Sequence, residues 1–334
     1  MSRFLVAPAA ARAALVVLAV LACGQRTPPR FRGVPWAAYG PPGPPGPLPS
    51  FGHVFVVVEE NANYAAVIGD TSMPYLNSLA RQYALATQFY ANTHPSIGNY
   101  FMMIVGDTIT NDDGFSGLVT RDNLVRALTT AGKTWKSYAE DLPAVGYAGA
   151  GRGRYARKHN IFVLLSDVAH DSAQARNLVP FTQLATDLAG NTLPDYAFII
   201  PNLCNDAHDC PLRTADAWLA THIDPLVRSE VFQRENSLLI IVFDESGVDD
   251  TVGGGRIACV IVSPQAKRGY ESTTFYQQQS LLRLSLRALG VTTYPGAAAS
   301  APDMDEFFET PGGGGGGPRA HRASAGGSSR SNQN

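Results

Sequence analysis

Short apolar runs alternate with longer amphipathic stretches through the middle of the chain, from about residue 51 to about residue 308. Strands covered on both faces are typically near-continuous hydrophobic runs, and such runs are found at residues 54–58, 196–200, 238–243 and 257–262. Helical periodicity is found at residues 74–84, 122–131, 181–188, 215–228 and 279–289. This alternation predicts an α/β sandwich of three layers, with helices flanking a mostly parallel central sheet.

The two ends of the chain do not have this pattern. Residues 24–50 are rich in proline and glycine, which favours an extended linker, and residues 311–334 form a Gly/Ser-rich tail with no apolar periodicity, which predicts disorder. We therefore expect one folded domain at residues 51–310.

Residues 1–23 have the features of an export signal. Arg3 and Arg12 precede an apolar run at residues 13–22, which is the length of a signal-peptide core and too short to span a bilayer comfortably. The sequence before Cys23 is similar to a bacterial lipoprotein cleavage site, so Cys23 is either lipidated as a membrane tether or removed in ordinary secretion. Both alternatives place the mature protein in the periplasm, cell envelope or extracellular space.

An oxidising compartment favours disulfides. Cys204 and Cys210 flank a tight loop and are the expected pair, whereas Cys259 lies in an apolar run and is expected to be a small buried hydrophobe.

The composition argues for a folded core and against a nucleic-acid-binding protein. Hydrophobic residues make up 45% of the chain and charged residues 16%, which is enough apolar material for a sizeable core. The net charge is −2 and the basic residues form no long run, so the chain lacks the positive surface typical of nucleic-acid binders. We expect a monomer.

Acidic and amide side chains follow two of the predicted strands. Glu60 and Asn61 come after the first strand, and Asp244 and Glu245 come directly after the run at 238–243. The carboxyl ends of parallel strands meet at one edge of a sheet, and oxygen donors suit divalent cations such as Ca²⁺, Mg²⁺, Mn²⁺ or Zn²⁺. Acids after strands can also simply cap helices, but two such groups at matching positions favour a metal site.

Ser96 follows Thr93-His-Pro and precedes a helix-like stretch at residues 97–105. Proline disfavours helix in the residue before it, so Ser96 is expected at the helix N-terminus. Free backbone N–H groups there can hold a phosphate beside the hydroxyl. A plain serine N-cap is the alternative.

Two histidines lie in polar surroundings. His208 belongs to a loop, residues 201–210, that also presents Asn205, Asp206 and Asp209 between the paired cysteines, which makes it a candidate acid or ligand. His159 has cationic neighbours and is a candidate phosphate contact.

In their order along the chain, several motifs resemble the bacterial phosphoesterase family of acid phosphatases and non-specific phospholipases C, a branch of the alkaline-phosphatase-like superfamily. They are Val57-Val-Glu-Glu-Asn61, Thr93-His-Pro-Ser96, Tyr138-Ala-Glu-Asp141, Ala156-Arg-Lys-His-Asn160, the 200–210 segment, Phe243-Asp-Glu-Ser246 and Ser280-Leu-Leu-Arg283. The resemblance covers almost all of residues 53–308 and implies an alkaline-phosphatase-like sandwich.

The resemblance also implies roles for single residues. A divalent metal would be held by Glu60, Asn61, Asp244, Glu245 and the nucleophile Ser96. The phosphate pocket would be lined by His159 and His208, with a contribution from Asn111. The chain departs from the pattern at Arg256 and Gln278, where relatives often have histidine; arginine remains a good phosphate partner.

These features predict an exported, metal-dependent phosphomonoesterase of acid-phosphatase type that forms a phosphoserine on Ser96, with His208 protonating the leaving group. The substrate is then a phosphorylated small molecule. Action on lipid headgroups, as a phospholipase C or a phosphoinositide phosphatase, is the first alternative. A non-catalytic envelope protein that binds phosphate or metal is the second.

Overall fold

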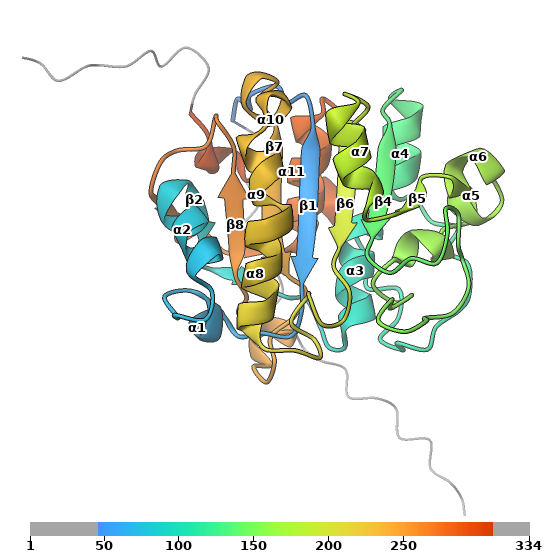
Figure 1. The fold of residues 1–334 in the computed structure, drawn as a ribbon, viewed down its shortest axis with the longest axis horizontal. Coiled ribbons are helices and arrows are strands. Elements are labelled where there is room, and N and C mark those ends of the chain that lie inside the picture. The colour runs from blue at the N-terminus through green and yellow to red at the C-terminus, as the bar shows by residue number, and fades with distance from the viewer. Residues whose placement is uncertain (1–45, 310–334) are drawn as a thin grey trace, which may run out of the picture. The chain divides into compact units, whose positions relative to one another are not determined.

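The computed structural model describes residues 46–309, which form the sandwich shown in Figure 1. The predicted signal segment, the lipidation site at Cys23, most of the linker and the tail lie outside the described residues. The domain boundaries themselves stay predictions. No helix within residues 46–309 combines the length and the hydrophobicity needed to cross a membrane.

The main sheet has eight strands in the order β5-β4-β6-β1-β7-β8-β2-β9. Their bounds are β1 Val54–Glu59, β2 Ala84–Ala86, β4 Trp135–Ala139, β5 Leu178–Pro180, β6 Tyr196–Ile200, β7 Leu238–Phe243, β8 Cys259–Val262 and β9 Tyr270–Ser272. A small second sheet pairs β3 (Phe89–Tyr90) with β10 (Tyr276–Gln277). The five strands from β5 to β7 are parallel, whereas β8 is antiparallel to both β7 and β2. The mostly parallel α/β fold predicted from the sequence is confirmed.

The longer helices are α2 Pro74–Gln82, α3 Ser96–Val105, α4 Leu124–Thr130, α7 Gln183–Ala189, α8 Leu212–His222 and α11 Gln278–Ala288. Single-turn or short helices are α1 Tyr64–Val67, α5 Ser166–Ala169, α6 Ser172–Ala175, α9 Asp224–Arg228 and α10 Glu230–Arg234, with 3₁₀ turns at Ile161–Leu164, Thr251–Gly253, Gly296–Ser300 and Asp305–Phe307. α3, α4 and α11 pack together behind the sheet in Figure 1, and α7, α8 and α9 lie in front of it.

Two predicted elements needed correction. The helix expected at residues 215–228 is two helices, because Pro225 has no backbone N–H and α8 ends before it at His222. The helix expected at 74–84 ends at Gln82, and Ala84 is already in β2, where it pairs with β8.

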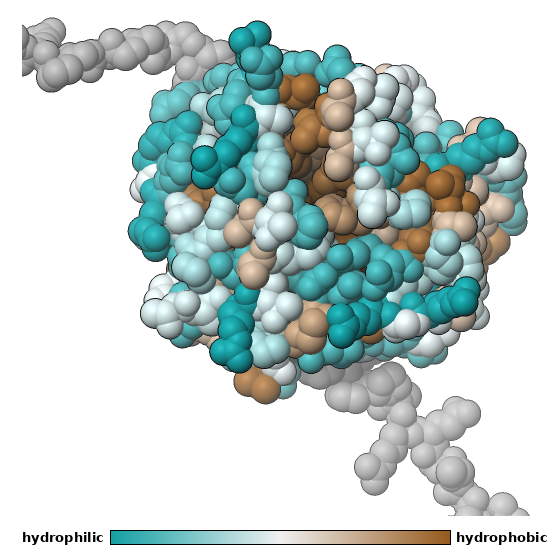
Figure 2. Space-filling model, in the orientation of Figure 1, coloured by the Kyte–Doolittle hydropathy of each residue, from teal (hydrophilic) through white to brown (hydrophobic). Residues whose placement is uncertain are grey.

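The core is apolar because the central strands of the sheet are covered by helices on both faces. Every residue of β1, β6 and β7 is buried. On the front face, apolar side chains line a hollow of about 630 Å³ between α7 and the α8–α9 pair, visible as the brown depression in Figure 2. Glu140 and Asp141, directly after β4, are among its lining residues.

Candidate active site

Ser96 is the first residue of α3, as expected, and it follows the cis peptide bond between His94 and Pro95. Its side chain does not cap the helix. The hydroxyl oxygen lies 3.2 Å from Glu60 Oε2 and 3.2 Å from Glu245 Oε1, and is buried. A hydroxyl has one proton and two lone pairs, so it can donate to only one of these carboxylates at a time. The geometry is that of a serine whose oxygen is surrounded by proton acceptors.

The acids around Ser96 come from three neighbouring strands. Glu60 follows β1, Asp206 lies in the loop after β6, and Asp244 and Glu245 follow β7. β1 lies between β6 and β7, and all three run parallel, so their carboxyl ends meet at one edge. Backbone bonds fix the loops to each other: Glu60 N–H donates to Asp206 O at 2.7 Å, and Asp244 N–H donates to Glu59 O at 2.9 Å. We call Glu60, Ser96, His159, Asp206, Asp244 and Glu245 the acid cluster.

The carboxylates of the acid cluster are buried and poorly compensated. Burial, and then the charges of Asp244 and Asp206, raise the pKa of Glu60 well above its ordinary value. Burial, and then the charge of Glu245, raise the pKa of Asp244 to about 8, and burial raises the pKa of Asp206 to about 7. One oxygen each of Asp244 and Asp206 is buried without a hydrogen-bond partner. Such oxygens are costly unless a cation or a donor satisfies them.

His159 lies in the acid cluster next to Glu60 and Asp206. Its Nε2 lies 3.2 Å from Glu60 Oε1 and its Nδ1 lies 3.5 Å from Asp206 Oδ2, although neither contact has hydrogen-bond geometry. The ring stacks on Tyr100, with 5.0 Å between centroids, and the Tyr100 hydroxyl donates to Glu60 Oε1 at 2.6 Å. Burial, together with the charge of Lys158, lowers the pKa of His159, so the imidazole is neutral and free to ligate a metal.

The ligand atoms of Glu60, His159 and Asp206 all lie within 4.8 Å of one another, which makes this triad a candidate metal site. Glu60 also faces Ser96, so the triad adjoins the ligand set expected from the sequence, in which Glu60 is joined by Asp244 and Glu245. Carboxylate oxygens with one imidazole suit a divalent cation, and the unpartnered oxygens of Asp206 and Asp244 fit that chemistry.

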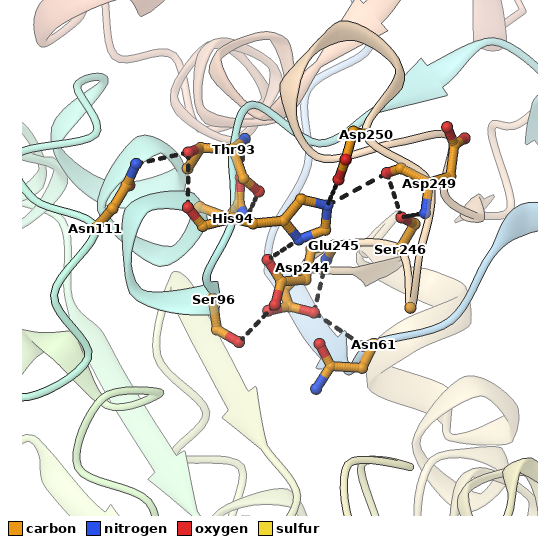
Figure 3. Close-up of polar contacts among 12 residues, drawn as sticks. Asn61, Thr93, His94, Ser96, Asn111, Asp244, Glu245, Ser246, Asp249 and Asp250 are labelled. Carbon is orange, nitrogen blue, oxygen red and sulfur yellow. Dashed lines mark hydrogen bonds and ion pairs between the residues drawn. The ribbon is translucent and has the colours of Figure 1, made fainter. Parts of the chain in front are cut away.

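Asn61 and Gln278 lie directly beside the acid cluster. The Asn61 N–H donates to Asp244 Oδ1 at 3.1 Å (Figure 3), and Asn61 has a positive φ of 54°, a conformation that asparagine tolerates. Gln278 stands where histidine was expected from the resemblance. It is buried, and its side-chain amide donates to the Asp244 carbonyl, so it supports the loop after β7.

The other predicted residues lie at different distances from the acid cluster. The partly exposed His208 pairs with Asp209 at 2.7 Å, and its ring centroid is 6.0 Å from that of His159, so it lies near the cluster. Asn111 donates to Thr93 Oγ1 at 2.8 Å (Figure 3). The structure does not bring Arg256 to the cluster: its guanidinium stacks on Tyr64, 3.8 Å from the ring centroid, and donates to Thr87 O.

The cysteines follow the expected pattern. Cys204 and Cys210 form a disulfide, which pins the loop that carries Asp206 and His208. Cys259 is a buried free thiol in β8.

Sequence reasoning missed His94 and Tyr100 as residues of the site, and it named Asp206 only as a member of the loop that carries His208. His94 Nδ1 lies 2.7 Å from Glu245 Oε2 and its Nε2 lies 3.2 Å from Asp249 O (Figure 3). The hydrogen bond to Glu245 raises the pKa of His94 to about 8. Tyr100 and Asp206 contact Glu60 or His159, as described above. The Thr93-His-Pro-Ser96 motif, which contains His94, was the available signal for this residue.

Comparisons with known proteins identify the family to which the chain belongs. The Phosphoesterase family model matches residues 70–291. A phosphatidylinositol-3-phosphatase of Mycobacterium tuberculosis is 35% identical over 264 residues, which is 78% of this chain and 84% of that protein. An acid phosphatase of Aspergillus fumigatus is 34% identical over 70% of this chain, but the chain spans only 54% of that protein.

Solved structures share the fold at low sequence identity. A protein of the alkaline phosphatase superfamily from Vibrio parahaemolyticus has a TM-score of 0.56 at 10% identity, covering 78% of this chain and 72% of that one. A lipoteichoic acid synthase from Listeria monocytogenes has a TM-score of 0.53 at 11% identity, covering 77% of this chain and 79% of that one.

Proposed function

Because this chain belongs to the Phosphoesterase family, and so is a hydrolase acting on phosphoric esters, we propose that it is a metal-dependent phosphomonoesterase with Ser96 as its nucleophile. The observation that carries the proposal is the position of the Ser96 hydroxyl, buried at a helix N-terminus and 3.2 Å from each of two carboxylates. A serine that only capped α3 would turn its oxygen back to the helix N–H groups.

The acid cluster supplies the ligands for the metal. Glu60, Asp244 and Glu245 would hold it next to Ser96, with Asn61 fixed beside Asp244, and the Glu60–His159–Asp206 triad offers a further place for a cation. When bound, a divalent cation offsets the charge of a serine alkoxide and of the phosphoryl oxygens. Four carboxylates packed this closely are otherwise an unfavourable place for a phosphate.

The chain's own groups account for the remaining chemistry. The Ser96 oxygen attacks phosphorus in line with the leaving oxygen, and a neighbouring carboxylate, Glu60 or Glu245, accepts the serine proton. The bond between phosphorus and the ester oxygen breaks, and the partly exposed His208, near His159, gives a proton to the departing alkoxide, which leaves as the alcohol. Water then attacks the phosphoserine, inorganic phosphate leaves, and the Ser96 hydroxyl is restored.

The first test uses the full-length chain and a simple aryl phosphate monoester. We expect chelator-sensitive release of inorganic phosphate, lost in Ser96→Ala. Ser78→Ala, an exposed serine on α2, should keep full activity. Intact-mass analysis of acid-quenched enzyme should show one added phosphoryl group in the wild type and none in Ser96→Ala. Activity that survives Ser96→Ala would refute the nucleophile, and an inactive wild type that binds phosphate or metal would favour the non-catalytic alternative.

Phosphoinositides are a second class of substrate with an observation in their favour. The mycobacterial relative is named a phosphatidylinositol-3-phosphatase, and Glu140 is one of the residues that line the apolar hollow of about 630 Å³. Glu140 accepts hydrogen bonds from Asn205 at 3.0 and 2.9 Å, in the loop that carries Asp206. A comparison of kcat/KM for a water-soluble phosphoinositide headgroup and for its lipid in micelles tests this: a preference for the lipid would favour action at a membrane.

We also propose that the chain acts outside the cytoplasm. The Cys204–Cys210 disulfide supports this, because disulfides persist in oxidising compartments. Fractionation of cells that express the full-length chain would test it, with labelling by radioactive palmitate to distinguish a lipidated Cys23 from ordinary secretion.

A further inference from the structure

A stretch of the chain without acidic residues follows β4 at the edge of the sheet that carries the acid cluster. After Asp141, the next acidic residue along the chain is Asp167. β4 pairs in parallel with β6, so both strands end at the lower edge of the sheet in Figure 1, where the loop that carries Asp206 begins. Residues 143–154 of this stretch, which we call the edge segment, therefore start from the same edge as the candidate active site.

The first part of the edge segment presents apolar side chains to solvent. Residues 143–151 read Pro-Ala-Val-Gly-Tyr-Ala-Gly-Ala-Gly and contain no charged side chain. The side chains exposed there are those of Pro143, Ala144, Val145, Ala148 and Ala150. Val145 is 54% exposed and is one of three large hydrophobic residues so exposed within residues 46–309. An exposed apolar stretch of this kind is typical of a surface that contacts a partner or a membrane.

The second part of the edge segment presents two cations. Arg152 and Tyr155 exchange backbone hydrogen bonds of 3.0 and 3.1 Å, which closes a tight turn with Gly153 and Arg154 at its tip. Gly153 has a positive φ of 61°, and a Cβ there would meet nothing within 4 Å, so the tip stands in solvent. Arg152 and Arg154 are exposed, and neither pairs with a carboxylate of the residues that the structure describes. Both guanidinium groups are therefore available to an external anion.

Contacts with the rest of the domain fix the edge segment beside the candidate active site. Tyr155 is buried, and the centroid of its ring lies 6.0 Å from that of Tyr147. The Leu203 N–H donates to Arg154 O at 3.1 Å. Leu203 belongs to the loop at residues 201–210, which contributes to the acid cluster. The exposed side chains of the edge segment are thus presented on a backbone that is bonded to the site.

Exposed apolar side chains next to unpaired cations are complementary to the surface of an anionic membrane. The apolar side chains can enter the boundary between headgroups and acyl chains, while arginines attract anionic headgroups. A soluble anion would use only the arginines and would leave Val145 in water. Val248, which is 84% exposed, lacks this combination, because its neighbours Asp249 and Asp250 are acids that an anionic surface repels.

We propose that the edge segment binds the surface of a membrane that contains anionic lipids. Val145 enters the lipid, and Arg152 and Arg154 contact the phosphates of the headgroups. This contact brings the edge of the sheet with Ser96 close to the lipid headgroups. The inference rests on the proposed function only in the purpose of the contact, which is access to phosphorylated headgroups; the membrane binding itself involves no catalysis.

The test measures co-sedimentation of the full-length chain with vesicles of phosphatidylcholine, with and without phosphatidylglycerol. Cys23→Ser in every sample removes any attached lipid, and binding by the N-terminal residues is then the same in all variants. Phosphatidylglycerol is a phosphodiester, so it offers Ser96 no phosphate monoester. The chain with an intact edge segment should bind the anionic vesicles more tightly than the neutral ones, and added salt should reduce the difference.

Two variants separate the cationic from the apolar contribution. Arg152→Gln/Arg154→Gln should weaken binding to anionic vesicles by about fivefold for each arginine, roughly 25-fold for both, and should leave binding to neutral vesicles unchanged. Val145→Ser should weaken binding to both kinds of vesicle by roughly three- to tenfold, because it removes an apolar side chain from the lipid.

Two control variants carry the same substitutions at other places. Arg228→Gln/Arg234→Gln removes two cations that are 78% and 76% exposed on α9 and α10, and it should not change vesicle binding. Val248→Ser removes a valine that is more exposed than Val145 but lies beside acids, and it should not change binding either.

The outcomes separate this inference from the proposed function. If the Arg152/Arg154 variant binds anionic vesicles like the wild type, or if the control arginines matter equally, the inference is wrong. If the two arginines matter but Val145→Ser has no effect, the segment attracts anions in general, and membrane docking is again refuted. If binding follows the expected pattern in a chain that hydrolyses no phosphate ester, the membrane-binding surface stands and only the proposed function fails.

Discussion

Asp187 and Asp244 are both buried carboxylates next to strands of the same sheet, but their surroundings are opposite. Asp187, on α7, accepts from Lys136 and Tyr138 of β4 at 2.6 Å each, and from Gln183 and Thr192 at 3.1 Å each. Asp244 accepts only backbone N–H groups on one oxygen and leaves the other without a partner. One carboxylate is saturated with donors, whereas the other is surrounded by further acids.

The two surroundings move the pKa values in opposite directions. Burial alone would raise the pKa of Asp187, but hydrogen bonds from Lys136 and Tyr138 outweigh it and the pKa is lowered. For Asp244, burial and the charge of Glu245 act together and raise the pKa to about 8. Burial of an acid therefore does not by itself indicate function. At Asp244 the oxygen left without a donor lies beside Ser96, where a ligand or a cation could complete the site.

The largest effect is expected from a change at Asp244, the carboxylate in the candidate active site, and it should be an effect on activity. Asp244→Asn keeps the shape and the acceptor for the two backbone N–H groups but removes the charge that we propose binds the metal, so kcat/KM should fall by about 10² to 10³ or more. In chelator the melting temperature should stay the same or rise, since a neutral group replaces an acid in a repulsive cluster. A melting temperature that falls together with the activity would mean that Asp244 is a structural residue.

A smaller effect, on stability and not on activity, is expected from a change at Asp187. Asp187→Asn puts an amide where Lys136 and Tyr138 need an acceptor, which should lower the free energy of unfolding by about 1–3 kcal/mol in urea titrations. Turnover by the folded enzyme should not change. Glu230→Gln, which affects an exposed pair with Arg234, is the matched control and should have no measurable effect on stability.

The smallest effect is the pH dependence of the stabilisation that the charge of Asp187 provides. The lowered pKa of Asp187 means that its stabilising contribution is present above the unfolded-state pKa of roughly 3.9 and is lost as pH falls through the folded-state value. The difference in unfolding free energy between the wild type and Asp187→Asn should therefore shrink from about pH 5 to about pH 3, as measured by urea titration at several pH values. A difference that stays constant with pH would show that the charge of Asp187 is not the stabilising feature.

The sequence predicted the centre of the fold better than its edges. The apolar runs that became β1, β6 and β7 were predicted to within one residue at each end, because strands buried on both faces leave an unbroken hydrophobic pattern. β4 was not predicted, since Lys136 and Ser137 interrupt its pattern. In the structure, Lys136 donates a hydrogen bond to Asp187, 51 residues away, and Ser137 donates one to Asn160, 23 residues away. The antiparallel direction of β8 was also beyond prediction, because a hydrophobic run has no direction.

The site could likewise be predicted only where a residue has a local signal in the sequence. Ser96, Glu60, Asp244 and Glu245 were suggested by their positions at the ends of predicted elements, and the structure brings them together. His94 was not suggested as a site residue, because its contacts are with Glu245, 151 residues away, and with the Asp249 carbonyl, 155 residues away. A residue defined by its long-range partners leaves no local signal.

The order of the ligands along the chain has a consequence for biosynthesis. Ser96 and Glu60 are made early, whereas Glu245, 149 residues after Ser96, follows only when β7 has been made and has paired with β1. A chain that ends before β7 therefore carries Ser96 and Glu60 but lacks Asp244 and Glu245, two of the proposed metal ligands. Under the proposed mechanism, such a truncated product has a serine without the acids that would activate it.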